Sequence, residues 1–265
     1  MVRWEVERAP TSVALLLGLG ADHGVPARAC LEGTGLVEEK LRGPGATVSP
    51  RQELAVIQNL LRALGDPPGL GMEAGVRYHL TTYGIWGYAL ISSPSWRSAM
   101  EVGLRFIDLT FAFSRIRARE RSGETDMVFD APDVPLGVRR FAIERDAAAV
   151  HTMQSELLVT DSSVTRVSFE FEPPADLARC TQIFGVVPEF GAGENCLEFD
   201  HELLHRPLPQ ANEHTAAIAE EQCRQLLATR HARSGMAGRV RDQLMARPAH
   251  PPSLEQVAVA LSMSG

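Results

Sequence analysis

Apolar residues recur every three or four positions through most of the first 110 residues, which is the spacing of one face of an α-helix. Gly, Pro and Asp residues separate the segments that have this spacing. Ser49 and Pro50 are typical of a helix start, because Ser caps a helix and Pro suits its first position. The pattern predicts helices over residues 13–19, 27–31, 53–64, 70–80 and 95–109.

Beyond residue 110 the spacing changes to the two-residue alternation of a β-strand, most clearly at Val167, Phe169 and Phe171. Ser122-Gly123 indicates the turn of a hairpin. Strands are predicted over residues 111–121, 125–129, 164–171 and 196–200, and helices over residues 136–158 and 176–184. This order predicts an α+β fold, in which a helical N-terminal region packs on a small, mostly antiparallel sheet.

A further helix is predicted over residues 211–230, after the Pro207-Leu208-Pro209 segment that ends the main body. Ala219, Cys223 and Leu226 form an apolar stripe on one side of it. A lone stripe at the end of a domain needs a cover, so the helix either links domains or protomers, or packs back on its own domain.

Composition narrows the class of protein. Hydrophobic residues make up 45% of the chain and the net charge is −7, which excludes wholesale disorder. The apolar run at residues 13–19 is too short to span a bilayer, and it lacks the flanks of a signal peptide. The four cysteines form no CxxC pair, which is typical of free thiols in a reducing compartment. We therefore expect a soluble, cytoplasmic protein without a membrane partner.

The last residues of the chain carry a helix-start signal. Ser253 and Gln256 have the spacing of a capping box, so a helix is predicted to begin there. Ala258 and Leu261 stand where the first helix of a helix-turn-helix needs a small residue and an apolar anchor. Ser264 would then cap the second helix. The residues assigned to this DNA-binding segment are Arg239, Ser253, Gln256 and Ser264.

The string P-S-L-E-Q-V-A-V-A-L-S-M-S at residues 252–264 resembles the start of the C-terminal DNA-binding domain of AraC-family transcription regulators. It departs from the family at Ser262, where many members have Gly. The resemblance also implies that the chain stops at Gly265 before the recognition helix, as a truncated regulator would. In this form it is expected not to read DNA bases.

Residues 83–99 are similar to the pattern Y-G-x-x-G-x-A-x-x-x-S-P-T-x-x-x-A of one AraC subgroup. Phe184-Gly185, Leu197-Glu198-Phe199 and Leu208-Pro209 fall where that subgroup has its closing strand and exit segment. The resemblance implies a sensor domain that binds a small effector and controls a DNA-binding end, in a homodimer. It divides the chain into an effector-sensing domain (1–209), a linker or dimerisation helix (210–234) and the incomplete, all-α start of a helix-turn-helix domain (235–265).

The expected effector is a hydrophobic or carboxylate-bearing molecule, and it would need an apolar cavity with a few polar groups. We predict this cavity between the region of residues 83–113 and the sheet. An alternative is that the aromatic residues there are simply core. The predicted apolar walls are Tyr83, Trp86, Tyr88, Phe106 and Phe113, and the predicted partners of an effector carboxylate are Arg77, Arg115 and Arg139.

One motif points to a different chemistry. His201, Glu202 and His205 form an H-E-x-x-H sequence, which binds zinc in a hydrolase when both His residues lie on one face of a long helix. Here a predicted strand precedes the motif and Pro207 follows it, so such a helix is not expected. We therefore predict no enzyme, no metal and no cofactor. A zinc hydrolase and a sensor that acts through a protein partner remain the alternatives.

Overall fold

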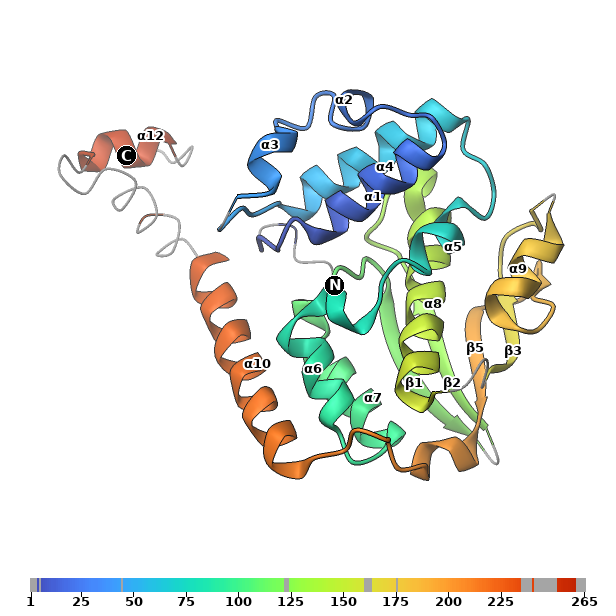
Figure 1. Ribbon diagram of the computed structural model, residues 1–265. Helices are drawn as coiled ribbons and strands as arrows, with labels where there is room; N and C mark the ends of the chain where they lie inside the picture. The colour runs from blue at the N-terminus through green and yellow to red at the C-terminus, as the bar shows by residue number, and fades with distance from the viewer. Residues whose placement is uncertain are drawn as a thin grey trace.

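The computed structural model describes residue 4 and residues 6–43, 45–121, 124–159, 164–174, 176–234, 240 and 252–260. Helices make up most of the N-terminal half, and the long helix α8 lies against the sheet (Figure 1). The helices of the N-terminal half are α1 (Thr11–Asp22), α2 (Ala27–Cys30), α3 (Glu38–Leu41), α4 (Pro50–Leu64), α5 (Leu70–Gly75), η1 (Leu80–Tyr83), α6 (Ile85–Ser92), α7 (Trp96–Arg105) and η2 (Ile107–Leu109). Those that follow are α8 (Leu136–Leu158), α9 (Leu177–Phe184), η3 (His201–His205), α10 (Glu213–Ser234) and α12 (Leu254–Ala260).

Five strands form one sheet in the order β1-β2-β5-β3-β4. All neighbours pair antiparallel except β3 and β4, which confirms the predicted α+β fold with a mostly antiparallel sheet. Residues 122–123, the predicted hairpin turn between the first two strands, lie outside the described residues. The strands are β1 (Arg115–Arg121), β2 (Glu124–Asp130), β3 (Val164–Phe169), β4 (Glu189–Phe190) and β5 (Asn195–Asp200).

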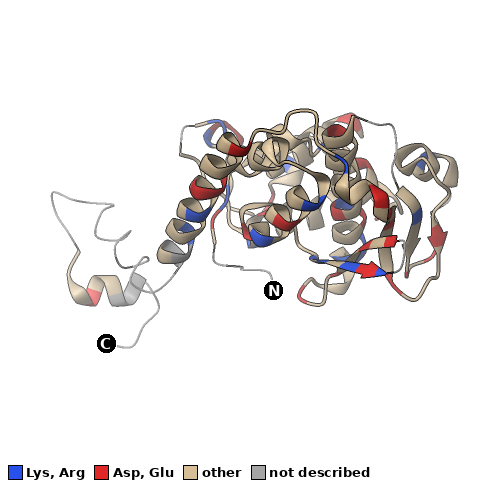
Figure 2. Ribbon diagram, turned by 90° about the horizontal axis from the view of Figure 1, so that it is seen from below, with Lys and Arg blue, Asp and Glu red and all other residues tan. Residues whose placement is uncertain are grey.

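One face of the sheet is covered with ion pairs. Figure 2 shows acidic and basic residues side by side on these strands. Arg119 lies opposite Asp126 in the register and pairs with it at 2.6 Å, and Arg121 reaches the same carboxylate at 3.1 Å. These cross-strand pairs neutralise the Asp126 carboxylate on a polar face, while the opposite face of the sheet carries the core.

At two of the predicted boundaries that differ from the structure, a distant side chain holds the backbone. The strand predicted from residue 111 begins only at Arg115, because the backbone N–H groups of Phe113 and Ser114 donate to the Asp146 carboxylate, at 3.0 and 2.7 Å, instead of to a neighbouring strand. The helix predicted over residues 70–80 ends at Gly75, and the backbone N–H of Leu80 donates to Glu156 at 2.9 Å.

Local capping explains where several helices start. The Ser49 hydroxyl accepts from the Gln52 backbone N–H at 3.2 Å, and the Gln52 side chain accepts from the Ser49 N–H at 3.0 Å. This capping box, with Pro50 in the first turn, starts α4 where Ser49 and Pro50 predicted a helix start. Ser95 and Asp176 cap α7 and α9 in the same way.

Helix α6 was not predicted from the periodicity of the sequence. Its residues Gly87 and Ala89, two positions apart and so on opposite sides of the helix, are both buried, and the segment has no polar face to mark its period. Gly87 makes the packing possible, because a Cβ there would overlap the carbonyl oxygen of Leu80.

Helix α10 packs on α6 of its own domain through Ala216, Ala219 and Cys223, which are buried. This face of α10 therefore has a cover within the same chain. Leu226, the third member of the predicted stripe, is 38% exposed. Arg105 of α7 also pairs with Glu220 of α10 at 2.8 Å.

The buried His151 of α8 is predicted to make stability depend on pH. Burial lowers its pKa from the ordinary value of 6.5, and its ring donates to the Ile183 carbonyl. Just below pH 6.5 the unfolded chain binds a proton that the folded chain does not, so the free energy of unfolding falls as the pH falls. The loss is at most about 1.4 kcal/mol per pH unit.

The His151→Gln variant keeps an N–H donor and removes the titration. We expect urea unfolding at pH 7.5 and at pH 5.5 to show a larger loss of stability for the unchanged protein than for this variant. Equal losses in the two proteins would contradict the assignment to His151.

Candidate functional site

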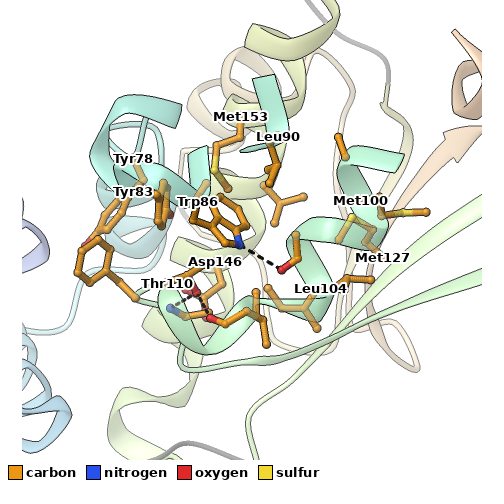
Figure 3. Close-up of a pocket in the computed structure, with 18 of the residues that line it drawn as sticks. Tyr78, Tyr83, Trp86, Leu90, Met100, Leu104, Thr110, Met127, Asp146 and Met153 are labelled. Atoms are coloured by element: carbon orange, nitrogen blue, oxygen red, sulfur yellow. Dashed lines mark hydrogen bonds between the residues drawn. The ribbon is translucent and has the colours of Figure 1, made fainter. Parts of the chain in front are cut away.

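A cavity of about 60 Å³ lies between α6, α7, α8 and the first two strands (Figure 3). Its walls are aromatic, aliphatic and methionine side chains, and the charged side chains among them are Arg145 and Asp146 of α8. Helices α6 and α7 are joined across the cavity wall, because the Trp86 indole N–H donates to the Gly103 carbonyl at 3.3 Å. The remaining lining residues include Tyr78, Tyr83, Leu90, Trp96, Ala99, Met100, Leu104, Ile107, Thr110, Phe111, Ile116, Met127, Ala149, Val150, Met153 and Leu157.

Arg145 is the centre of a buried ionic network beside the cavity. Its side chain is 1% exposed, and it donates to Asp146 Oδ1 at 2.8 and 3.0 Å, to Glu53 Oε1 at 3.1 Å and to the Phe111 carbonyl at 2.7 Å. Burial alone would lower the pKa of Arg145. The raising effect of Asp146, Tyr78 and Glu53 together is larger, so the pKa is raised and the guanidinium stays charged.

The two carboxylates of this network are fully engaged. Asp146 Oδ2 accepts the N–H groups of Phe113 and Ser114. Glu53 Oε1 also accepts the Ser12 hydroxyl at 2.6 Å, and its other oxygen pairs with Arg8 at 3.4 Å. Two arginines thus face two carboxylates, and the network has no net charge.

Tyr78 connects the network to the aromatic wall. Its hydroxyl lies 2.6 Å from the Ser12 hydroxyl, and its ring lies 5.5 Å below the Arg145 guanidinium. Burial raises the pKa of Tyr78 to about 12 and raises that of Tyr83 well above its ordinary value. Both phenols therefore stay neutral at physiological pH.

The five predicted aromatic wall residues divide into three groups. Tyr83 and Trp86 line the cavity, with ring centroids 4.9 Å apart. Phe113 lies on the far side of the network, where its ring stacks below Arg145 at 5.0 Å. Phe106 is buried at the end of α7 outside the lining, and Tyr88 points to solvent with 52% of its surface exposed. Their role in effector binding stays a prediction.

The three predicted arginine partners lie elsewhere and already have partners. Arg77 pairs with Asp22 at 2.8 Å and Arg115 with Asp133 at 2.9 Å. Arg139 donates to the backbone carbonyls of Pro132 and Val134. The arginine that does line the cavity, Arg145, was missed. The sequence feature that could have indicated its burial is the charged run Glu144-Arg145-Asp146, which lies inside a long predicted helix between mostly apolar residues.

Residues 24–208 match the family model described as the arabinose-binding domain of AraC transcription regulators, at the N-terminus. The chain belongs to this family. The matched range contains the cavity and the sheet that closes it, and ends before α10. This chain is therefore a transcription regulator with an AraC-type ligand-binding N-terminal domain.

Relatives of this AraC-type regulator extend over nearly all of the chain. It is 32% identical to the ornithine utilization regulator of Pseudomonas aeruginosa, over 100% of this chain and 78% of that protein. It is 30% identical to HTH-type transcriptional regulators of Mycobacterium tuberculosis and Mycobacterium bovis, over 98% of this chain and 76% of theirs. The crystal structure of the regulator CdpR from Pseudomonas aeruginosa has the same fold, with a TM-score of 0.61 at 21% identity over 96% of this chain and 76% of that chain.

The H-E-x-x-H motif does not form a zinc site of the hydrolase type. Residues His201–His205 form the 3₁₀ helix η3, in which side chains four apart no longer share a face. The rings of His201 and His205 are edge-on with centroids 5.9 Å apart. Within the described residues, the groups whose ligand atoms converge lie around Asp126 and do not include this motif. The chain is a regulator and not an enzyme.

We expect the His201→Ala/His205→Ala variant to contain the same amount of zinc as the unchanged protein, because among the described residues no third ligand atom converges on these two rings. Native and denatured masses of the two purified proteins measure this directly. One zinc ion per chain that disappears in the variant would contradict the expectation.

The predicted capping box at the C-terminal end is present. The Ser253 N–H donates to Gln256 Oε1 at 2.9 Å, the Gln256 N–H donates to Ser253 Oγ at 3.3 Å, and α12 follows. Arg239 and Ser264, the other two residues assigned to DNA binding, lie outside the described residues.

Among the helices that the structure describes, none is both long and apolar enough to cross a membrane.

Proposed function

We propose that a small effector bound in the cavity controls the DNA-binding end of this regulator. The observation that carries the proposal is the position of α6 between the cavity and helix α10. Trp86 and Leu90 of α6 line the cavity, while α6 also packs against α10, the helix that leads towards the C-terminal segment (Figure 1). A change in the cavity therefore acts on a helix that α10 contacts directly.

A second connection lies at η2. Ile107 lines the cavity, and the carbonyl of the next residue, Asp108, accepts from Arg230 of α10 at 3.3 Å. Burial lowers the pKa of Arg230, as expected of a guanidinium held against the body of the protein. An effector that binds more tightly to one arrangement of α6 and η2 favours the α10 position that goes with that arrangement. The difference between its affinities for the two arrangements sets how far the equilibrium shifts.

The proposal keeps the division into a sensing domain (1–209), a linker helix (210–234) and the start of a DNA-binding domain (235–265). In a homodimer, the position of the linker helix would set the separation of two DNA-binding ends, and operator half-sites have a fixed spacing. The regulator would act in the bacterial cytoplasm, where its DNA is.

Filling the cavity tests this function in cells. Ala149→Leu adds side-chain volume at the cavity wall, and Ala178→Leu adds the same atoms at an exposed position of α9. Chromatin immunoprecipitation and transcript profiles are compared for both variants and the unchanged protein, each expressed with a complete DNA-binding domain, across several carbon and nitrogen sources. We expect Ala149→Leu to occupy the same DNA sites while its target transcripts no longer respond to the nutrient.

Two results would reject the proposal in different ways. If no DNA site is enriched for the unchanged protein, the sensor acts through another partner. If Ala149→Leu responds like Ala178→Leu, the cavity is not where the effector binds.

A further inference from the structure

The cavity wall offers little for a charged molecule to bind. Methionines enter it from three elements, Met100 from α7, Met127 from β2 and Met153 from α8 (Figure 3). The charged groups at the wall, Arg145 and Asp146, are already paired with each other. The surrounding lining is aromatic and aliphatic.

An ionised ligand would upset a balanced network. The two positive charges of Arg8 and Arg145 match the two negative charges of Glu53 and Asp146. All four carboxylate oxygens accept hydrogen bonds from described residues. A carboxylate or an ammonium group placed here would be a buried charge without a counter-ion, and such burial is strongly unfavourable.

One polar group at the wall lacks a partner. The Trp96 side chain lines the cavity and is 4% exposed, yet within the described residues its indole N–H has no acceptor. The Trp86 indole of the same cavity is satisfied by the Gly103 carbonyl. Buried indole N–H groups normally have an acceptor. Trp96 therefore has one hydrogen bond left to donate to a molecule that reaches its N–H.

We infer that the effector is a neutral, largely apolar small molecule with one hydrogen-bond acceptor, which the Trp96 N–H binds. This inference rests on the proposed function and names the chemical class of its effector. Of the hydrophobic and the carboxylate-bearing effectors that the sequence left open, it selects the hydrophobic one, because the predicted arginine partners are turned to other carboxylates and carbonyls.

The size of the cavity sets how such a molecule enters. Its volume of about 60 Å³ is below the roughly 150 Å³ of an engineered cavity that accepts benzene. A ring therefore has to displace side chains. Met100 lies one helical turn from Trp96 on α7, and its unbranched, flexible side chain moves more readily than a β-branched or aromatic one. Its displacement opens the way to the Trp96 N–H.

Four probes of similar size test the inference on the purified chain. Acetophenone is neutral with a carbonyl acceptor, toluene is neutral without one, benzoate is an anion and benzylamine a cation at pH 7. Dissociation constants come from ligand-observed NMR titrations. We expect acetophenone to bind most tightly and the two ions at least about tenfold more weakly. Ala149→Leu is expected to abolish binding of the neutral probes.

The Trp96→Phe variant separates the hydrogen bond from the apolar contact. It should weaken the binding of acetophenone roughly three- to tenfold and leave the binding of toluene unchanged. An equal loss for both probes would reject Trp96 as the hydrogen-bond donor. Benzoate or benzylamine binding as tightly as acetophenone, or no binding of either neutral probe to the unchanged chain, would reject the ligand class. If the neutral probes bind the purified chain but no DNA site is enriched in cells, the proposed function is rejected and the ligand class still holds.

Discussion

Replacing Arg145 with Met is expected to lower the free energy of unfolding by about 4 kcal/mol. Met has a similar length but no charge, so Glu53 and Asp146 are left buried with only Arg8 as a positive partner. Breaking a buried ion pair from one side is costly because the remaining charge stays desolvated. Urea unfolding followed by circular dichroism measures the change. Arg42→Met, at a side chain that is 81% exposed, should change stability by less than about 0.5 kcal/mol.

A double-mutant cycle tests whether charge balance is the cause. Glu53→Gln alone leaves the network with one extra positive charge, and Arg145→Met alone leaves one extra negative charge. The double variant is balanced again, so it is expected to be more stable than the sum of the single effects predicts, by about 1 kcal/mol or more. Strict additivity would show that the cost comes from packing and not from the unpaired charge.

Gly75→Ala is expected to cost about 3 kcal/mol, because α5 and α8 cross at Gly71 and Gly75 with almost no space between their backbones. A Cβ at position 75 would overlap the Arg145 carbonyl oxygen and lie 2.6 Å from the Ala148 Cβ. Neither contact is the end of a flexible side chain, so one helix has to move. The movement would also shift Arg145, which the cavity and the ionic network share.

Gly18→Ala is the matched control for this substitution. Gly18 is also in a helix, and nothing lies within 4 Å of the position its Cβ would take. Since Ala forms helix more readily than Gly, the control should raise the free energy of unfolding, by up to about 1 kcal/mol. Thermal unfolding of the two variants is expected to shift in opposite directions. A loss of stability in both would mean that the helix crossing is not what distinguishes Gly75.

Several features of the fold followed from local sequence. The capping pairs Ser49–Gln52 and Ser253–Gln256 were recognisable because the interacting residues are only three positions apart. The observed bounds of α8, Leu136–Leu158, matched the prediction. The alternation of apolar residues at Val167 and Phe169 identified a strand, and both side chains are buried.

The candidate site was only partly predictable. Tyr83 and Trp86, two of the five predicted wall residues, line the cavity, and both lie within the pattern at residues 83–99. Tyr88 lies in the same pattern, but its side chain is 52% exposed, and a helix buried on two faces has no polar residues in its sequence to mark its orientation. No periodicity could show that an arginine inside α8 would be the charge at the wall.

The sequence by itself determined the types of the elements, most of their order, and the AraC-type family, because these depend on periodicity, capping and short patterns within one segment. The tertiary structure alone decided the cavity, the ionic network and the contact of α6 with α10. Arg145 meets Glu53 across 92 positions of the chain, and Arg230 meets Asp108 across 122. Such contacts depend on how helices pack in space, and the spacing of residues along the chain does not contain that information.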